Sequence, residues 1–232
     1  MHKVNYGTQD LFFELKRTER KTLAIEVHPD SSIWAVAPMQ AELDEIKNRI
    51  VKRGQWILKQ QQYFEQFLPR TPEREYVSGE THFYLGRGYV LKIRKGEQNS
   101  VKLKSGELQV VSKKPSPELA RKQLAEWYYH HSEKKFHAIL KNTFMKFSRF
   151  KIEFPELEIK RMSKRWGSCT ANGKVIINPE IIKAPTKCIE YLITHELCHL
   201  IEHSHNKKFY ALLTEQMPNW EKWKGVLERK MS

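Results

Sequence analysis

Five consecutive residues late in the chain have the types and the spacing of a catalytic metal site: His195-Glu196-Leu197-Cys198-His199. On a helix, two histidines four positions apart project from one face about one turn apart, which suits two nitrogen ligands on a single Zn²⁺. Glu196 lies roughly 100° further round such a helix, where it can reach a metal-bound water but not easily the metal. The pattern predicts one catalytic zinc ion, with His195 and His199 as ligands and Glu196 as general base.

A catalytic zinc site needs a third protein ligand, and several candidates follow the pentapeptide. His203 lies four residues beyond His199, but on a continuing helix it would stand about 12 Å along the axis from the first histidine, too far to share one metal. The chain must therefore turn after His199. His205 has the offset of the last histidine in the HExxHxxGxxH pattern, although Glu202 replaces the glycine of that pattern. His205 is the preferred third ligand, with His203 and the carboxylate of Glu215 as alternatives.

The surrounding sequence predicts which elements hold these residues. Apolar side chains recur at helical intervals after Pro185-Thr186, so the pentapeptide lies on a predicted helix that begins there. Asn172-Gly173 between two strand-like runs is a strong hairpin signal. In zinc peptidases an edge strand often receives the substrate backbone by strand addition. The candidate for this substrate strand consists of Lys174, Val175, Ile176, Ile177 and Asn178.

Two side chains, Tyr210 and Arg165, are candidates for stabilising the oxyanion that forms during hydrolysis. The alternative is that both are packing or surface residues. Arg165 opens a short block, Arg165-Trp166-Gly167-Ser168-Cys169, in which Gly167 permits an unusual backbone angle or a close approach beside the bulky Trp166. Two interpretations fit Trp166 equally well: a place beside the helix of the pentapeptide, or a place in the hydrophobic core.

The same residues resemble a known family. The sequence His195-Glu196-Leu197-Cys198-His199-Leu200, with His205 and then Phe209-Tyr210, resembles the YgjP-type zinc metallopeptidases, which are relatives of the SprT-like proteases. The resemblance extends over nearly the whole chain, although only the C-terminal third of it is specific. The further matching segments are Arg165 to Cys169, Ile176 to Asn178, Ala184-Pro185, Trp56-Ile57 and Tyr84 to Tyr89.

The resemblance implies His195, His199 and His205 as zinc ligands and Glu196 as general base. It also implies that the substrate is a protein or a peptide. One departure is His203-Ser204, where a Pro-Asn pair is common in the family. This departure leaves the implied ligand set intact.

The chain is predicted to have an α+β fold with two domains. Residues 1–115 are predicted to form a β-rich N-terminal domain, with a hairpin over residues 22–37 and one helix from about 41 to 67, in which Gly54 is a candidate interruption. Ser116 and Pro117 have the types that begin a helix, so the boundary is placed before them. Residues 116–232 are predicted to form a zincin-like metallopeptidase domain with a small sheet and the helix of the pentapeptide. No internal repeat is visible in the sequence.

Composition and charge indicate where the protein is located and what it can bind. No uninterrupted apolar stretch approaches the roughly 20 residues that span a bilayer, and the first residues lack the apolar run of a secretory signal. The three cysteines have no paired spacing, which argues against a disulfide framework. These features predict a cytoplasmic protein without a membrane partner. The net charge of +14 favours encounters with polyanions, so nucleic acid is a candidate partner.

Two hypotheses for the function follow from these observations. The first is a zinc-dependent metallopeptidase, a hydrolase that acts on a protein or a peptide. The alternative is a basic nucleic-acid-associated protein with a structural or vestigial zinc site, or a protease acting on DNA-bound proteins. Zinc-dependent hydrolysis of a non-peptide amide would use the same residues. The sequence carries no indication of the oligomeric state.

Overall fold

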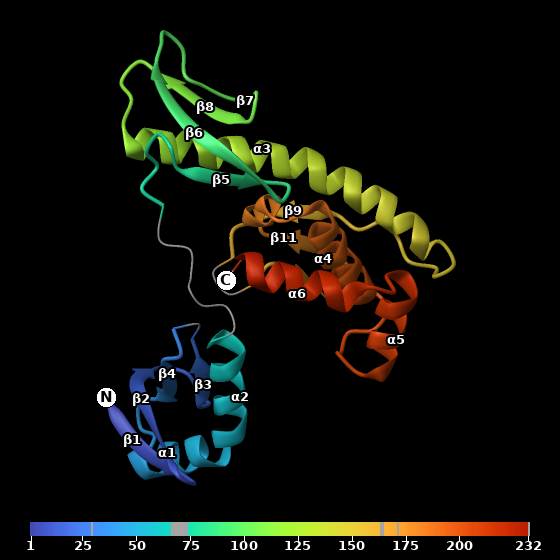
Figure 1. Ribbon diagram of the computed structural model, residues 1–232. Helices are drawn as coiled ribbons and strands as arrows, with labels where there is room; N and C mark the ends of the chain where they lie inside the picture. Colours follow the sequence, from blue (N-terminus) through green and yellow to red (C-terminus); the bar gives the residue numbers. More distant parts are fainter. Residues whose placement is uncertain (29, 66–73, 163–164, 171, 232) are drawn as a thin grey trace. The chain divides into compact units, whose positions relative to one another are not determined.

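The computed structural model describes residues 1–28, 30–65, 74–162, 165–170 and 172–231, and the chain forms two compact units divided between residues 72 and 73 (Figure 1). The N-terminal unit holds the described residues up to 65, and the C-terminal unit holds those from 74 to 231. Each unit combines helices with a four-stranded sheet and has a hydrophobic core of its own. This arrangement confirms the predicted α+β class.

The N-terminal unit is a four-stranded sheet followed by two helices. Its elements are β1 (His2–Tyr6), β2 (Gln9–Thr18), β3 (Ala24–Val27), β4 (Ile33–Pro38), α1 (Leu43–Lys52) and α2 (Gly54–Glu65). The strand order is β1-β2-β4-β3, in which β2 and β4 are parallel and the two outer pairs are antiparallel. The predicted hairpin is the β3–β4 pair. Apolar side chains of the sheet and helices form the core, among them Phe13, Ile33, Ile46, Ile50 and Ile57.

Two helices stand where the sequence predicted one, and the last two residues of that prediction lie outside the described residues. Helix α1 ends at Lys52 and α2 begins at Gly54. A Cβ atom on Gly54 would lie 2.3 Å from Cδ2 of Tyr6, so the ring of a β1 residue occupies the space that a side chain would fill. Glycine is needed here for this close approach, and its low helix propensity favours an interruption at the same point.

Gly54→Ala is expected to destabilise the N-terminal unit by about 1–3 kcal/mol, because the added methyl group overlaps the Tyr6 ring and forces the helix away from β1. Denaturant unfolding followed by circular dichroism measures the change. In a Tyr6→Leu background the same substitution should cost less, since the ring is gone. Equal costs in the two backgrounds would contradict the proposed overlap.

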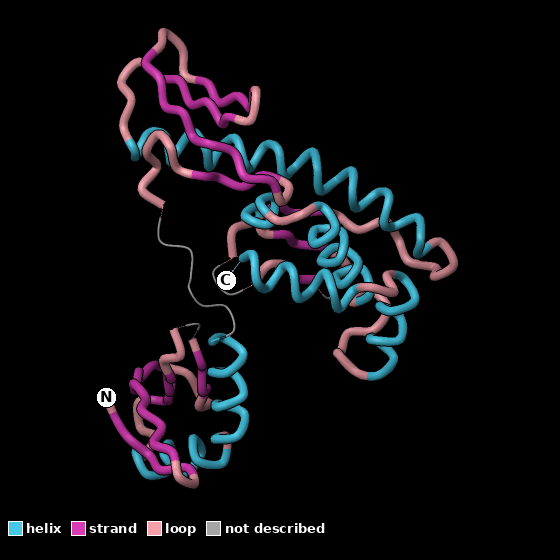
Figure 2. Tube along the Cα trace, in the orientation of Figure 1, coloured by secondary structure: helices cyan, strands magenta, loops and turns pink. Residues whose placement is uncertain are grey.

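The C-terminal unit opens with a second four-stranded sheet, formed by β5 (Thr81–Tyr84), β6 (Arg87–Lys95), β7 (Ser100–Lys104) and β8 (Glu107–Ser112). The 28-residue helix α3 (Pro117–Phe144) follows, and Ser116 Oγ accepts a hydrogen bond from the Leu119 N–H at 3.2 Å, which confirms the predicted N-cap. Helix α3 contacts this sheet and also the helix that carries the pentapeptide (Figures 1 and 2).

The two four-stranded sheets have the same topology. The second sheet has the order β5-β6-β8-β7, again with a parallel central pair and antiparallel outer pairs, and a helix follows its last strand as in the first unit. The buried pair Phe13 and Ile33 in the first sheet corresponds to the buried pair Leu91 and Leu108 in the second. The sequence does not reveal this structural repeat, because many apolar residues satisfy the same burial pattern.

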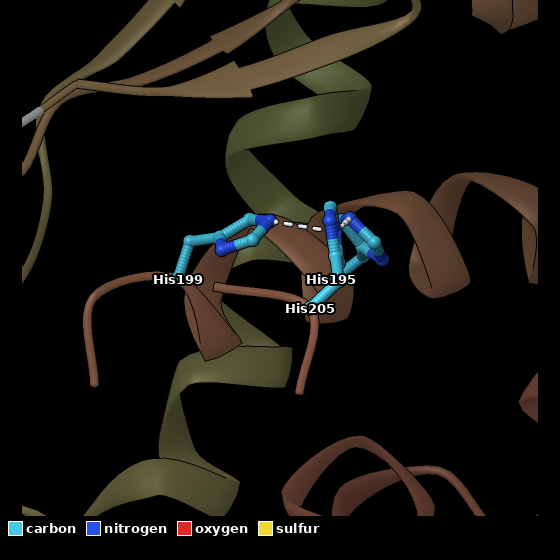
Figure 3. A group of neighbouring side chains, drawn as sticks. All are labelled: His195, His199 and His205. Atoms are coloured by element: carbon cyan, nitrogen blue, oxygen red, sulfur yellow. Dashed lines mark hydrogen bonds between the residues drawn. The ribbon is translucent and has the colours of Figure 1, made fainter. Parts of the chain in front are cut away.

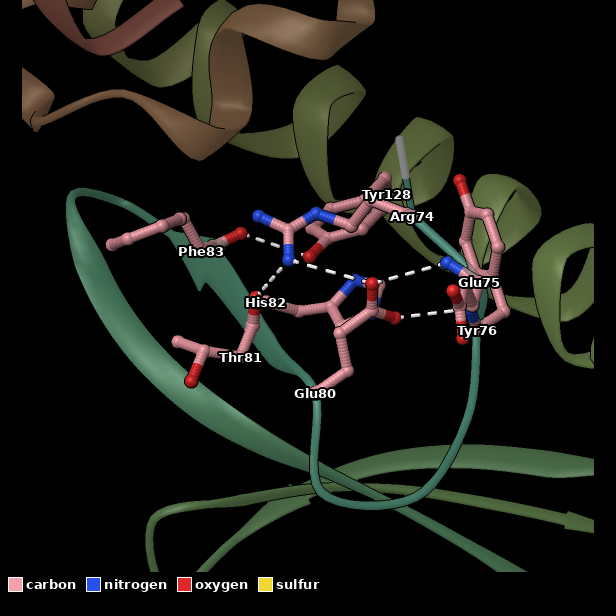
Figure 4. Close-up of polar contacts among 8 residues, drawn as sticks. All are labelled: Arg74, Glu75, Tyr76, Glu80, Thr81, His82, Phe83 and Tyr128. Atoms are coloured by element: carbon pink, nitrogen blue, oxygen red, sulfur yellow. Dashed lines mark hydrogen bonds and ion pairs between the residues drawn. The ribbon is translucent and has the colours of Figure 1, made fainter. Parts of the chain in front are cut away.

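A partly buried polar cluster joins the start of the C-terminal unit to β5 (Figure 4). The Glu80 carboxylate accepts hydrogen bonds from the backbone N–H groups of Glu75 (3.2 Å) and Tyr76 (3.0 Å). It also lies 2.9 Å from Nε2 of His82, which is 2% exposed. Burial lowers the pKa of His82, and the adjacent carboxylate opposes this effect. The cluster satisfies polar groups that the chain brings into contact with the sheet.

The predicted domain boundary at 115/116 falls inside the C-terminal unit, so the structure places the division earlier. The second sheet is joined to the elements that follow it. The Leu85 N–H donates to the Ile182 carbonyl at 2.8 Å, and the Tyr128 hydroxyl on α3 donates to the Phe83 carbonyl at 2.8 Å (Figure 4). A helix start at 117 resembles a boundary in the sequence, but this helix packs against the elements on both sides of it in the chain.

The rest of the C-terminal unit carries the predicted site. A three-stranded sheet has the order β10-β11-β9, formed by β9 (Leu157–Ile159), β10 (Gly167–Cys169) and β11 (Val175–Ile177). The other elements are the short 3-10 helices η1 (Met145–Phe147) and η2 (Pro179–Lys183), then α4 (Thr186–Cys198), α5 (Lys207–Gln216) and α6 (Trp220–Met231). None of the described helices has the length and the apolar composition that a membrane crossing demands.

Candidate metal centre

Helix α4 and the turn after it bring three histidines together (Figure 3). His195 lies on α4, His199 is the residue that caps the C-terminal end of that helix, and His205 lies in the turn before α5. The Nε2 atom of His205 is 3.0 Å from Nε2 of His195 and 3.1 Å from Nε2 of His199. Because His195 and His199 are half-buried and His205 is exposed, the three nitrogens converge at a point that can be reached from solvent.

A metal ion accounts for this convergence better than hydrogen bonds among the imidazoles. A ring nitrogen offers either one proton or one lone pair, so Nε2 of His205 makes a proper hydrogen bond with at most one of its two neighbours. Nitrogen ligands placed tetrahedrally around Zn²⁺ at about 2.0–2.1 Å lie about 3.3 Å apart, close to the separations found here. Within the part of the chain that the structure describes, these histidines form the single group of ligand side chains close enough to hold a metal ion.

Local contacts keep the imidazoles in the form that binds a metal. The Nδ1–H of His199 donates to the Glu202 backbone carbonyl at 3.1 Å, which leaves the lone pair on Nε2. Burial is the main cause that lowers the pKa of His195 to about 3, and the neighbouring histidines contribute to the same shift. Burial also lowers the pKa of His199. Both rings are therefore neutral near pH 7, as metal binding requires.

Aromatic rings fix the orientation of the three histidines. Phe209, which is fully buried in the first turn of α5, has its ring centroid 4.9 Å from that of His195, 4.6 Å from His199 and 4.7 Å from His205. Nδ1 of His195 is buried without a hydrogen-bond partner among the described residues, so ring packing against Phe209 and Tyr191 orients this imidazole. Apart from the family resemblance, no pattern in the sequence indicated a role for Phe209.

The Glu196 carboxylate lies against β10 and is shielded from water. Glu196 is 4% exposed. Burial raises the pKa of its carboxyl group to about 8, and the positive charge of Arg165 partly opposes this effect. A Cβ atom on Gly167 would lie 2.5 Å from Oε1 of Glu196, which is closer than such atoms can approach. Gly167 is therefore the residue that makes room for the carboxylate beside the strand.

Comparison with known proteins identifies the type of protein that carries this site. A family model described as a YgjP-like metallopeptidase domain matches residues 21–230. The chain belongs to the YgjP-like metallopeptidase family. The resemblance found in the sequence is thereby confirmed, and so is the prediction that the protein is a peptidase. No curated protein matches the chain significantly.

Two solved structures overlap part of this YgjP-like metallopeptidase. The metallopeptidase zymogen of Pyrococcus abyssi abylysin is 17% identical, with a TM-score of 0.37 over 41% of this chain and 91% of that chain. The metallopeptidase zymogen of Methanocaldococcus jannaschii jannalysin is 19% identical, with a TM-score of 0.37 over 42% of this chain and 97% of that chain. The likeness is partial in both cases.

The predicted substrate strand of the YgjP-like protein is not an edge strand, so this prediction was wrong. Residues 174–178 contain β11, which is the middle strand of its sheet. It pairs with β10 on one side, where Ile176 faces Ser168, and with β9 on the other, where Ile176 faces Glu158. Backbone groups on both sides of β11 are therefore already used. The sequence marked these runs as strands but could not indicate that β9 would occupy the second side of β11.

The edge strand that contacts helix α4 is β10. The backbone groups of Trp166 and Thr170 form hydrogen bonds of 2.9 Å across to the neighbouring strand. Because antiparallel strands alternate in the direction of their backbone groups, those of Gly167 and Cys169 point away from β11. Gly167 also contacts Glu196, so this edge lies next to the carboxylate.

The two oxyanion candidates lie near different residues of the YgjP-like site. The exposed ring of Tyr210 stacks on His205, with centroids 6.2 Å apart, and on Trp220 at 5.6 Å. Arg165 is exposed, and it is close enough to Glu196 for its charge to oppose the effect of burial on the pKa of that carboxyl group.

The alternatives for the third ligand lie outside the histidine group. His203 is exposed and does not belong to that group. Glu215 forms an ion pair with Arg149. Of the three candidates named from the sequence, His205 is the one that the structure brings next to His195 and His199.

Proposed function

We propose that this YgjP-like metallopeptidase hydrolyses peptide bonds with one zinc ion held by His195, His199 and His205, and with Glu196 as general base. The observation that supports this most strongly is the convergence of three Nε2 atoms, with that of His205 lying 3.0 and 3.1 Å from the other two, next to the helix that also carries the buried Glu196. The ligand set is neutral, so a bound divalent ion keeps its charge and its power to activate water.

The metal and the residues around it would have different roles in the hydrolysis. Zinc bound at this site would lower the pKa of a water ligand towards neutrality and polarise the substrate carbonyl. Glu196 takes the proton of the attacking water and returns it to the leaving amine. Burial raises the pKa of this carboxyl group, which makes its ionised form a stronger base towards the attacking water.

We place the substrate backbone along β10 rather than along β11. The free backbone groups of Gly167 and Cys169 would pair with an extended peptide, as in other complexes formed by strand addition. This arrangement brings the scissile bond close to Glu196, because Gly167 touches that carboxylate. Arg165, which lies just before the strand, or Tyr210 beside His205 would then stabilise the oxyanion.

The zinc content and its removal test the proposed function. Protein purified without chelators should contain about one equivalent of zinc, as a three-histidine catalytic site requires. Removing the zinc with 1,10-phenanthroline should abolish hydrolysis of fluorescent casein, and adding Zn²⁺ should restore it. His205→Ala should lose the zinc, whereas the matched variants His203→Ala and Glu215→Gln should keep it. Full activity in metal-free protein would refute the proposal.

Nucleic-acid association and a cytoplasmic location stay predictions from the sequence. The net charge of +14 supports the first of them. A gel shift of duplex DNA at rising salt concentration tests it, because binding through phosphate contacts weakens steeply with salt.

A further inference from the structure

The turn between His199 and His205 is held by one residue at its centre. Glu202 accepts a hydrogen bond from Nδ1–H of His199 through its backbone carbonyl, at 3.1 Å. Its side chain points to the other end of the turn, where Oε1 accepts a hydrogen bond from Nδ2–H of Asn206 at 3.1 Å. Asn206 is the residue directly after His205. One residue therefore contacts both ends of the segment that must bring the two ligands together.

Asn206 uses both ends of its amide group. Its Oδ1 accepts hydrogen bonds from the backbone N–H groups of Lys208 at 2.9 Å and Phe209 at 3.1 Å, which caps α5. Its Nδ2 is the donor to Glu202. The side chain thus ties the first turn of α5, which carries the Phe209 ring beneath the histidines, to the end of α4.

His205 needs a restraint of this kind. It lies outside any helix and is exposed, and the hydrogen-bond-range contacts of its imidazole among the described residues are those with the other two histidines. Ring packing against Phe209 and Tyr210 orients this imidazole, but the backbone that carries it belongs to no helix or strand. In the HExxHxxGxxH pattern a glycine makes the turn, whereas Glu202 is not among the described non-glycine residues with a positive φ. The turn here has backbone hydrogen bonds from the Glu202 N–H to the Cys198 carbonyl at 2.9 Å and from the Asn206 N–H to the Ser204 carbonyl at 2.7 Å, and the side-chain bond between Glu202 and Asn206 adds to them.

We propose that Glu202 and Asn206 form a clamp that positions His199 and His205 for metal binding. The inference rests on the proposed zinc site and adds two positioning residues to it. Residues of this kind do not touch the metal, but they keep the ligands near their bound geometry, and their loss typically weakens metal affinity by about 10–100-fold. The clamp supplies this restraint from the side of His205, whose imidazole is the most exposed of the three.

Exchanging donor and acceptor across the clamp tests the proposal. Asn206→Asp keeps the helix cap, since aspartate caps as well as asparagine, but it removes the donor and sets two carboxylates against each other. Glu202→Gln keeps an acceptor for the Asn206 amide. The double variant Glu202→Gln/Asn206→Asp restores a hydrogen bond with the opposite polarity and has the same net charge as the wild type. Glu202→Ala removes the link altogether.

The readout is the dissociation constant of zinc, measured by competition with a chromophoric chelator at about 1 M salt, where the Debye length is about 3 Å and added charges act little at a distance. Asn206→Asp and Glu202→Ala should bind zinc about 10–100-fold more weakly, while Glu202→Gln and the double variant should stay close to the wild type. Thermal unfolding of the metal-free forms should be nearly unchanged, which separates positioning from a general role in folding.

Two results would overturn the clamp: an unchanged zinc affinity of Asn206→Asp, or a double variant that binds as weakly as Asn206→Asp. A wild-type protein that binds no zinc would refute the proposed function itself, together with the clamp that rests on it. A wild-type protein that binds zinc with variants that bind equally well refutes the clamp alone.

Discussion

Glu196→Gln is expected to lower kcat/KM for peptide hydrolysis by about 10²–10⁴-fold while the protein keeps its zinc. Glutamine has the shape of glutamate and fits the same space against β10, but it cannot accept the proton of the attacking water. Glu196 does not belong to the group of side chains close enough to hold the metal, so the zinc content should not change. Hydrolysis of a fluorescent protein substrate and elemental analysis of the same sample measure both quantities.

Glu190→Gln is the matched control for this experiment. Glu190 lies on the same helix but forms its ion pairs with Lys146 and Lys187, away from the histidines. Its replacement should leave hydrolysis nearly unchanged. If Glu196→Gln retained wild-type activity, another group would have to act as the base. A loss of zinc together with activity would instead indicate that Glu196 supports the metal.

Gly167→Ala is expected to lower kcat/KM by about 10²-fold, with the zinc retained. The new Cβ atom would lie 2.5 Å from Oε1 and 3.0 Å from Cδ of Glu196, so the carboxylate must move away from β10. Displacing a catalytic group by about 1 Å costs a factor of this order, because its approach to the reacting atoms is lost. The substitution also alters the strand that we propose for substrate binding, so KM should rise as well.

Gly225→Ala is the control for adding a methyl group elsewhere in the C-terminal unit. Gly225 lies in α6, where the nearest atom to a new Cβ would be the flexible end of Arg229 at 3.4 Å. Alanine should stabilise that helix by about 0.5–1 kcal/mol and leave activity unchanged. If Gly167→Ala were as active as Gly225→Ala, the contact between Gly167 and Glu196 would have no part in catalysis.

Much of the candidate site was predictable because its geometry follows from helix dimensions. The four-residue spacing of His195 and His199 places both rings on one face, and the helix rise excludes His203 from sharing their metal. His205 followed from its offset alone. The packing of Phe209 under all three rings was not predictable, because it depends on how α5 returns towards α4 after the turn.

The errors concern contacts between segments that are distant in the sequence. Strand order could not be predicted, because the burial pattern of Val175–Ile177 does not indicate which strands pair with this strand. The interruption of the first helical segment at Gly54 agrees with the sequence, but the contact of Gly54 with the ring of Tyr6, which lies far away in the chain, could not be predicted. The division between residues 72 and 73, rather than at 115/116, follows from the packing of the second sheet against α3. No local sequence pattern indicates that this sheet packs there.

The repeated sheet-and-helix arrangement bears on how this family can diversify. In the C-terminal copy, α3 supports α4 and the turn between β5 and β6 bonds to η2, so selection on catalysis constrains its packing. The N-terminal copy has its own hydrophobic core and contains none of the candidate site residues. The sequence of the N-terminal arrangement can therefore vary as long as its own core is kept.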